Sequence, residues 1–101
     1  MTARDVRYAR QFGEQLAGLP DPVYDRVEAS IDVIAANPGL ARGYDPTYEA
    51  AKPPVPCRCY PVPRTTKVIY LFADEGSNTL TMLFLGDARE DPRHRFDRME
   101  W

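Results

Sequence analysis

The pattern of apolar and polar positions predicts a pair of strands in the second half of the chain. Residues Lys67–Ala73 form an almost unbroken run of β-branched and aromatic side chains, typical of a central strand covered on both faces. The segment Thr79–Leu85 begins with strict alternation, which places Leu80, Met82 and Phe84 on one side. Residues 74–78 lie between the two runs and suit a hairpin turn. The two runs therefore predict a buried β-hairpin.

The first half of the chain has helical spacing instead. A short strand is expected at Val6–Tyr8, followed by a helix from about Arg10 to Gly18. The buried stripe of this helix would be Phe12, Leu16 and Leu19. A second helix is expected from about Pro22 to Ala36, with Val23, Val27, Ile31 and Ile34 as its stripe. Because the link between them is short, the two helices should lie antiparallel.

Prolines punctuate the rest of the chain. Asp21 is expected to cap the second helix, with Pro22 in its first turn. From Gly39 to Pro63 six prolines exclude a long helix, so a long surface loop is predicted. A strand at Cys57–Val62 would be kept at an edge by Pro61 and Pro63. A short terminal helix is expected after Arg89, with Asp91 as its N-cap and Pro92 as its first residue. Trp101 would pack on a helix or stay exposed.

The order of these elements predicts an α+β fold: two antiparallel helices on one face of a small antiparallel sheet. With 101 residues, the chain is expected to form a single domain spanning 1–101. Its sequence has no stretch of about 20 apolar residues that could cross a membrane and no apolar leader. We therefore expect no membrane association and a cytoplasmic location.

The charge of the chain is slightly acidic and unevenly distributed. The formal net charge is −2, and the isoelectric point is about 5.3. Residues 1–51 carry −3 and residues 52–101 carry +1. This charge argues against broad electrostatic attraction to nucleic acid, and any basic surface is expected to be local and to belong to the sheet half.

The cysteine pattern does not predict a metal site. Cys57 and Cys59 would point to the same side of a strand, too far apart for an easy disulfide. Only His94 could join them, which leaves too few ligands for zinc. We expect two reduced thiols, with no metal and no cofactor.

Taken together, the motifs resemble those of the RelE/ParE superfamily of bacterial toxins. The opening VRYARQFGEQLAGLP and the helix ending in AANPG are similar to the start of that family. The strand TKVIYLF is similar to its central strand, and TLTMLFLGDARED to its last strand and charged rim. The resemblance covers nearly the whole chain except Gly39 to Cys57.

The resemblance implies the toxin of a type II toxin–antitoxin system. In the RelE-like branch such a toxin is a metal-independent endoribonuclease that cuts messenger RNA on the ribosome and stops translation. In the ParE-like branch it inhibits DNA gyrase. A third alternative is a family member without catalysis that acts only by binding a partner. The implied partners are a cognate antitoxin together with the ribosome and mRNA, or gyrase, in a homodimer or a toxin–antitoxin heterotetramer.

The resemblance also implies candidate site residues. Arg89 stands where the RNA-cutting branch has its rim arginine. Lys67 stands where the family usually has an arginine, and it departs from the family because a lysine supplies a charge but does not bind phosphate bidentately. His94 takes the place of a tyrosine or histidine, and Glu49, Tyr48 or Tyr44 could supply the second acid–base group. The catalytic candidates are Arg89, His94, Lys67 and Glu49; the phosphate-binding candidates are Arg58, Arg64, Lys52, Arg93 and Arg95.

Each candidate also has a structural interpretation. Arg89 follows Asp87 closely and could form a surface ion pair. His94 could be a solvated tail residue, and Lys67 a polar residue at a strand start. Tyr44 and Tyr48 could pin the long loop to the core rather than contact RNA. The acidic isoelectric point and the missing tyrosine after the rim favour the gyrase-directed or binding alternatives.

Overall fold

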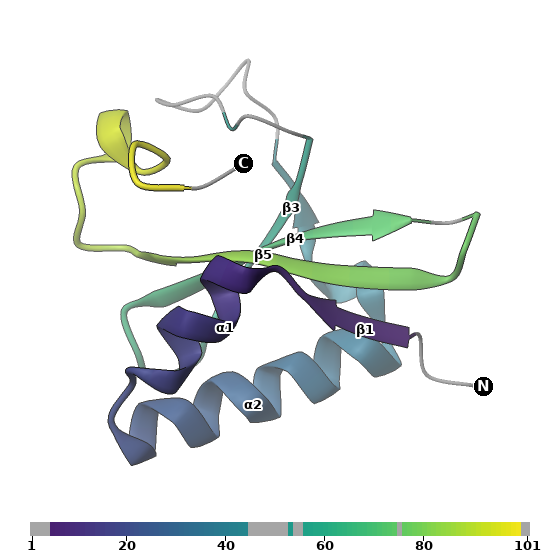
Figure 1. The fold of residues 1–101 in the computed structure, drawn as a ribbon, viewed down its shortest axis with the longest axis horizontal. Helices are drawn as coiled ribbons and strands as arrows, with labels where there is room; N and C mark the ends of the chain where they lie inside the picture. Colours follow the sequence, from purple (N-terminus) through teal and green to yellow (C-terminus); the bar gives the residue numbers. More distant parts are fainter. Residues whose placement is uncertain (1–4, 45–52, 54–55, 75, 100–101) are drawn as a thin grey trace.

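The protein has an α+β fold with two α-helices and a five-stranded sheet (Figure 1). The computed structural model describes residues 5–44, 53, 56–74 and 76–99. In chain order the elements are β1 (Asp5–Tyr8), α1 (Arg10–Ala17), α2 (Asp21–Ala36), the 3-10 helix η1 (Pro38–Leu40), β2 (Arg42–Gly43), β3 (Arg58–Pro61), β4 (Lys67–Asp74), β5 (Thr79–Asp87) and the 3-10 helix η2 (Pro92–His94). No helix among these residues is long and apolar enough to cross a membrane.

The sheet is mixed, so the prediction of an antiparallel sheet was wrong. The strand order is β1-β5-β4-β3-β2, and β1 runs parallel to β5 while the other neighbours are antiparallel. Val6 lies opposite Leu80, and Tyr8 opposite Met82. The first strand thus pairs with the last described strand. Hydrophobic periodicity gives the alternation of side chains but not the direction of the partner strand.

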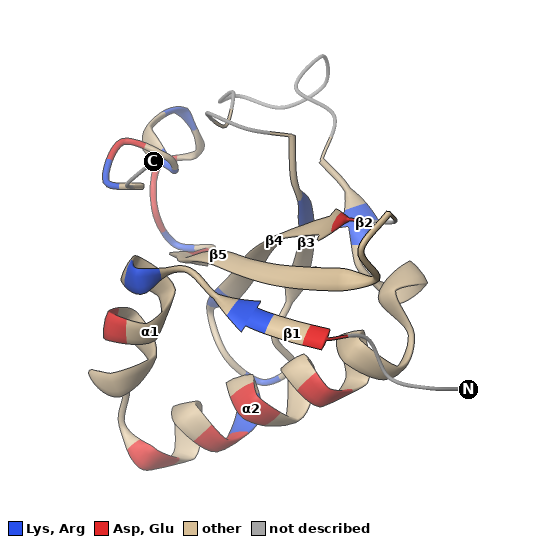
Figure 2. Ribbon diagram, turned by 45° about the vertical axis from the view of Figure 1, so that its right-hand side comes forward, with Lys and Arg blue, Asp and Glu red and all other residues tan. Residues whose placement is uncertain are grey.

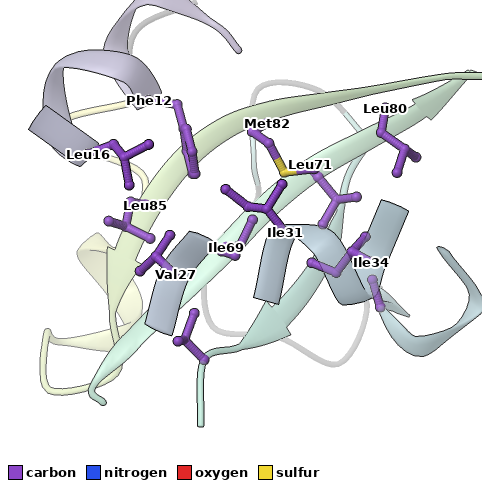
Figure 3. Packing of buried hydrophobic residues seen from close by; sticks show 12 residues of the cluster. Phe12, Leu16, Val27, Ile31, Ile34, Ile69, Leu71, Leu80, Met82 and Leu85 are labelled. Atoms are coloured by element: carbon purple, nitrogen blue, oxygen red, sulfur yellow. The ribbon is translucent and has the colours of Figure 1, made fainter. Parts of the chain in front are cut away.

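Both helices cover one face of the sheet, called here the helix face (Figure 3). The predicted stripes are confirmed: Phe12 and Leu16 of α1 are buried, as are Val27, Ile31 and Ile34 of α2. Leu19 and Val23 are half-buried against the same cluster. From the sheet this core receives Ile69, Leu71, Leu80, Met82 and Leu85. The removal of this apolar surface from water is the main stabilising contribution to the fold.

The joint between the helices differs from the prediction by one residue. Helix α2 begins at Asp21, and Pro20 occupies the N-cap position without a side-chain cap. The Val23 and Tyr24 amides donate to the Pro20 carbonyl, at 3.0 and 2.9 Å, which starts the helix earlier. From this joint α1 and α2 diverge over the helix face instead of lying side by side (Figures 1 and 2), so the prediction of two antiparallel helices was wrong. The predicted cap at Asp91 is confirmed, because its side chain accepts from the Arg93 amide at the start of η2.

A β-bulge changes the faces of β5. Tyr70 pairs with Phe84 but Leu71 pairs with Met82, so Leu83 is the extra residue. Leu80 and Met82 lie on the helix face, whereas Phe84 lies on the opposite face, called here the second face. The prediction that Phe84 shares a side with them was wrong, because the bulge reverses the alternation after Leu83.

The second face is covered by the end of the chain, which folds back over the sheet (Figure 1). Its cluster consists of Tyr44, Cys57, Cys59, Tyr70, Phe84, Phe96 and Met99. Tyr70 lies 5.0 Å from Phe96 and 6.4 Å from Phe84 between ring centroids. The cover reaches only part of β4, since Phe72 remains 42% exposed. The expectation of a strand covered on both faces thus holds for its central residues alone.

The segment predicted as a surface loop contains regular structure at both ends. Residues 38–40 form η1, and Arg42–Gly43 pair with Cys59 and Arg58 as a short edge strand. The predicted strand at Cys57–Val62 is confirmed as β3, and its Pro61 lies beyond the part that β2 covers. Four residues named above fall outside the described part of the chain: Tyr48, Glu49, Lys52 and Trp101.

Candidate functional site

The first candidate residues, Lys67 and Arg89, meet at one carboxylate. Lys67 begins β4, and its register partner Asp87 ends β5. The Lys67 Nζ lies 3.6 Å from Asp87 Oδ2. Arg89 donates to the same carboxylate from Nη2 at 2.9 Å, from Nε at 3.2 Å and from its backbone amide at 2.9 Å. We call these three residues the rim.

The rim carboxylate is strongly held in its ionised form. Hydrogen bonds from Arg89 hold the pKa of Asp87 well below its usual range, and Thr66 adds a further hydrogen bond, while partial burial opposes them. The Arg89 pKa is raised by the same contact. The Asp87 side chain is only 12% exposed, whereas that of Arg89 is 75% exposed. The Arg89 guanidinium is therefore accessible to a second anion, while Asp87 stays partly buried beneath it.

A pocket of about 400 Å³ lies between the rim and α1. Gln15 forms its wall and fastens α1 to β5, because its side chain donates to the Leu85 carbonyl and accepts from the Leu85 amide, both at 2.8 Å. Glu90 and Arg98 also line the pocket and form an ion pair. The charged residues lining it are Lys67, Arg98, Glu14, Asp87 and Glu90. With Arg89 included, positive and negative charges at this site are balanced.

A smaller pocket of about 160 Å³ lies behind the rim on the second face. Arg42, Tyr70 and Arg95 line it together with Asp87 and Glu90. Burial raises the pKa of Tyr70 to about 12, although Arg95 works in the opposite direction. Tyr70 therefore stays protonated near neutral pH. It is a buried hydrogen-bonding group rather than a general base.

His94 does not join the rim. Its Nδ1 lies 2.8 Å from Asp97 Oδ2, and both side chains are well exposed on the C-terminal segment. It lines neither of the two pockets beside the rim. The structure thus brings Lys67 and Arg89 together but leaves His94 on a separate surface.

The remaining cationic candidates are dispersed. Arg58 donates to the Pro38 carbonyl at 3.3 Å, and Arg93 pairs with Asp91 at 2.8 Å. The Arg95 guanidinium lies 5.8 Å from the centre of the Tyr44 ring. Arg64 lies in the turn before β4. Glu49, Lys52 and Tyr48 were named from the sequence but lie outside the described residues.

Tyr44 has a structural role of the kind foreseen as an alternative. It is 7% exposed and contacts both Tyr70 and Phe96 edge to face. It fastens the start of the long connection to the second face. Burial likewise raises the pKa of the Cys57 thiol to about 11, and neither Cys57 nor Cys59 forms a disulfide. Across the described residues, no three His, Cys, Asp or Glu side chains gather as metal ligands.

The sequence did not single out several residues that build this site. Asp87 was noted only as a neighbour of Arg89, and its cross-strand contact with Lys67 depends on the register of the hairpin. Gln15 looked like one polar residue on a helix, yet it joins α1 to β5. The ion pair between Glu90 and Arg98 forms across a turn of the chain. The Asp-x-Arg spacing was the one local signal for the rim.

Comparison with known proteins adds no relative. The chain matches no protein-family model, no curated protein and no solved structure.

Proposed function

We propose that this chain is a RelE/ParE-like toxin that cleaves messenger RNA on the ribosome without a metal ion, with the rim as its phosphate-binding surface. One observation carries the proposal. The hairpin brings Lys67 and Arg89 to the same carboxylate, and Lys67 and Asp87 line a pocket of about 400 Å³. Two cations held side by side can stabilise the charge that develops on a phosphate during cleavage.

The exposure of Arg89 supports this role. Its side chain is largely exposed to solvent, while its backbone amide and its guanidinium both donate hydrogen bonds to the Asp87 carboxylate. A phosphate oxygen can replace Asp87 as acceptor, since a planar guanidinium binds both groups bidentately. Lys67 then adds a second positive charge from the neighbouring strand. Asp87 acts as a positioning residue in this arrangement.

None of the three rim residues supplies the acid or base that RNA cleavage needs. Asp87 is a weak base because its pKa is depressed, and His94 faces Asp97 on another surface. The family resemblance points to His94 for this step, and the chemistry of cleavage makes Glu49 a candidate for the second acid–base group. The proposal therefore predicts that His94→Ala lowers cleavage while leaving RNA binding at the rim intact.

The second candidate is a toxin that acts by binding a protein, such as the gyrase-directed branch. The balance of charges around the rim favours it, because a polyanion gains little from a neutral surface. In either case a cognate antitoxin is the proposed partner. Among the described strands β1 pairs with β5 alone, so its outer edge is the proposed place for strand addition.

Growth after controlled induction in a bacterial host tests the proposal. Arg89→Ala should relieve the arrest caused by the unaltered chain, because it removes the exposed phosphate contact. Arg7→Ala is a matched control, since Arg7 binds Asp5 with the same Asp-x-Arg spacing and a similar side-chain exposure, 70% against 75%. The control should arrest growth as strongly as the unaltered chain.

Two assays separate the candidate functions. Mapping of RNA 5′ ends in a purified translation system should show cuts that depend on ribosomes and on Arg89, also in the presence of a chelator. Absence of cuts, with loss of gyrase supercoiling activity, would transfer the proposal to the protein-binding alternative. If the folded protein neither cleaves RNA nor inhibits gyrase, both candidate functions would be contradicted.

A further inference from the structure

A groove lies on the far side of α2 from β1, away from the rim pocket. It runs between α2 and the turn that joins β3 to β4, which lie beside each other in Figure 2. Its volume is about 230 Å³. The residues that define it are Arg26, Ser30, Val33, Tyr60, Pro63 and Arg64. None of them lines the rim pocket.

The two arginines of this groove differ from those of the rim. Neither Arg26 nor Arg64 pairs with a carboxylate among the described residues. Arg26 Nη1 instead donates to the Arg64 carbonyl at 3.0 Å. Arg64 has a φ of 63°, in the left-handed region that non-glycine residues rarely adopt. Backbone in sparsely populated φ/ψ regions clusters at functional sites such as ligand clamps, so the conformation of Arg64 points to a binding role.

The floor of the groove also has an unpaired polar group. Ser30 is 4% exposed, and its hydroxyl makes no hydrogen bond in the part of the chain that the structure describes. Buried polar groups without partners are rare, because each costs free energy. A ligand atom that reaches Ser30 would supply the missing hydrogen bond.

The walls of the groove are apolar. Val33 is 42% exposed although it lies within α2, and Tyr60 and Pro63 lie on the side of the β-strands. The sugars of a nucleic acid backbone expose only small C–H surfaces, so they would bury less apolar area against such walls than an aliphatic side chain does. Carboxylates at Asp25, Glu28 and Asp32 occupy other positions of α2 and would repel a long polyanion. The groove suits a single negative group joined to an aliphatic side chain.

We propose that this groove docks an acidic, aliphatic segment of a partner protein: a carboxylate bound by Arg26 and Arg64, with a neighbouring aliphatic side chain against Val33. The charge complementarity between these cations and one carboxylate identifies the occupant. The proposal does not depend on the toxin function or on the rim.

Selection from a phage-displayed library of random short peptides against the full-length chain tests this. Enriched peptides should contain Glu or Asp beside Leu, Ile or Val. Their dissociation constants should then be measured for the unaltered chain and its variants. Arg64→Gly should weaken binding by about tenfold or more, since a charge-assisted hydrogen bond is lost. Its melting temperature should be unchanged or higher, because glycine accepts a φ of 63° without strain.

The matched controls make the outcome decisive. Arg93→Gln removes an exposed arginine elsewhere and should leave the dissociation constant unchanged. Replacing the acidic residue of the peptide with its amide should weaken binding as much as Arg64→Gly does. Failure to enrich any peptide, enrichment of peptides without an acid, or equal affinity for Arg64→Gly would overturn the proposal. Displacement of the peptide by oligouridylate only in the presence of Arg64 would assign the groove to nucleic acid instead.

Discussion

The two faces of the sheet are covered in different ways. The helix face is buried by α1 and α2, whose backbone hydrogen bonds lie within each helix and whose apolar stripes are aliphatic apart from Phe12. The second face is buried by residues 91–99, which are irregular apart from η2. That cover depends on Phe96, on Met99 and on a few polar contacts, such as Gln11 Nε2 to the Arg98 carbonyl at 2.6 Å.

This difference predicts which part of the molecule unfolds locally at the lowest free energy. Regular helices over an aliphatic core should set the global free energy of unfolding. An irregular cover held by few anchors should open locally at a lower free energy. The rim lies where the two covers meet, because its Asp87 lines the pockets on both sides. Substitutions on each face should therefore separate stability from access to the site.

The largest effect is expected for phenylalanine substitutions on opposite faces. Phe12→Ala removes a fully buried ring from the helix face and should cost about 3–5 kcal/mol of unfolding free energy. Phe96→Ala should cost less, about 1–3 kcal/mol, because the C-terminal cover can detach while the helix face stays packed. Urea denaturation followed by circular dichroism measures both values.

Thiol labelling measures local opening of the second face directly. Cys57 and Cys59 are buried under the second face, so their alkylation by iodoacetamide reports local opening there. Phe96→Ala should accelerate alkylation under native conditions by about tenfold or more. Equal acceleration by Phe96→Ala and by an equally destabilising helix-face variant would show that the two faces open together.

An intermediate effect is expected at Gly86, which lies on β5 beneath the second face. A Cβ at this position would approach Tyr70 Cε2 to 2.7 Å, inside the aromatic cluster. Gly86→Ala should therefore destabilise by about 1–3 kcal/mol through overpacking. Tyr70→Leu in the same chain should recover part of that loss.

Gly13→Ala is the matched control on α1. No atom lies within 4 Å of a Cβ built at Gly13, apart from its chain neighbours and its own helix backbone. Alanine should stabilise this helix by up to about 1 kcal/mol. Thermal unfolding of the two single variants should thus give shifts of opposite sign, and shifts of the same sign would contradict the packing argument.

At the rim, which lies between the two covers, stability should depend on pH. The folded-state pKa of Asp87 lies below its unfolded value of about 3.9. The stability it contributes is thus complete above that unfolded value and is lost as pH falls toward the folded value. Asp87→Asn should destabilise by about 1–2 kcal/mol at pH 7, and the difference from the unaltered chain should shrink from about pH 5 downward.

Arg89→Ala separates the causes of that pH dependence. The hydrogen bond from Arg89 is the largest cause of the depressed pKa, so this variant should lose most of the pH-dependent stability. Urea denaturation of all three proteins between pH 7 and strongly acid solution provides the measurement. A difference between Asp87→Asn and the unaltered chain that stays constant down to strongly acid pH would contradict the assignment.

Much of the local structure could be predicted because it depends on neighbours in the chain. The helical stripes, the turn before Thr79 and the cap at Asp91 follow from spacings of a few residues. The contact between Asp87 and Arg89 is of the same kind, since only one residue separates them. The exact start of α2 was missed because Pro20, not Asp21, occupies the cap position.

The contact that builds the rim could not be predicted in this way. Counting from the hairpin turn without a bulge would place Gly86 opposite Lys67. The bulge at Leu83 shifts the register by one residue, so that Asp87 faces Lys67 instead. The same bulge moves Phe84 to the second face. No residue of the alternating pattern signals this shift, because it depends on packing against both covers.

The sequence by itself thus determined the elements of this protein, their apolar stripes and the short-range pairing of its charged residues. The tertiary structure alone decided that β1 runs parallel to β5, that residues 91–99 cover the second face, and that Arg26 and Arg64 meet across a groove. Periodicity and capping act within a few residues of backbone. Strand direction, register and grooves depend instead on contacts between distant segments, and these are chosen by the packing of the whole chain.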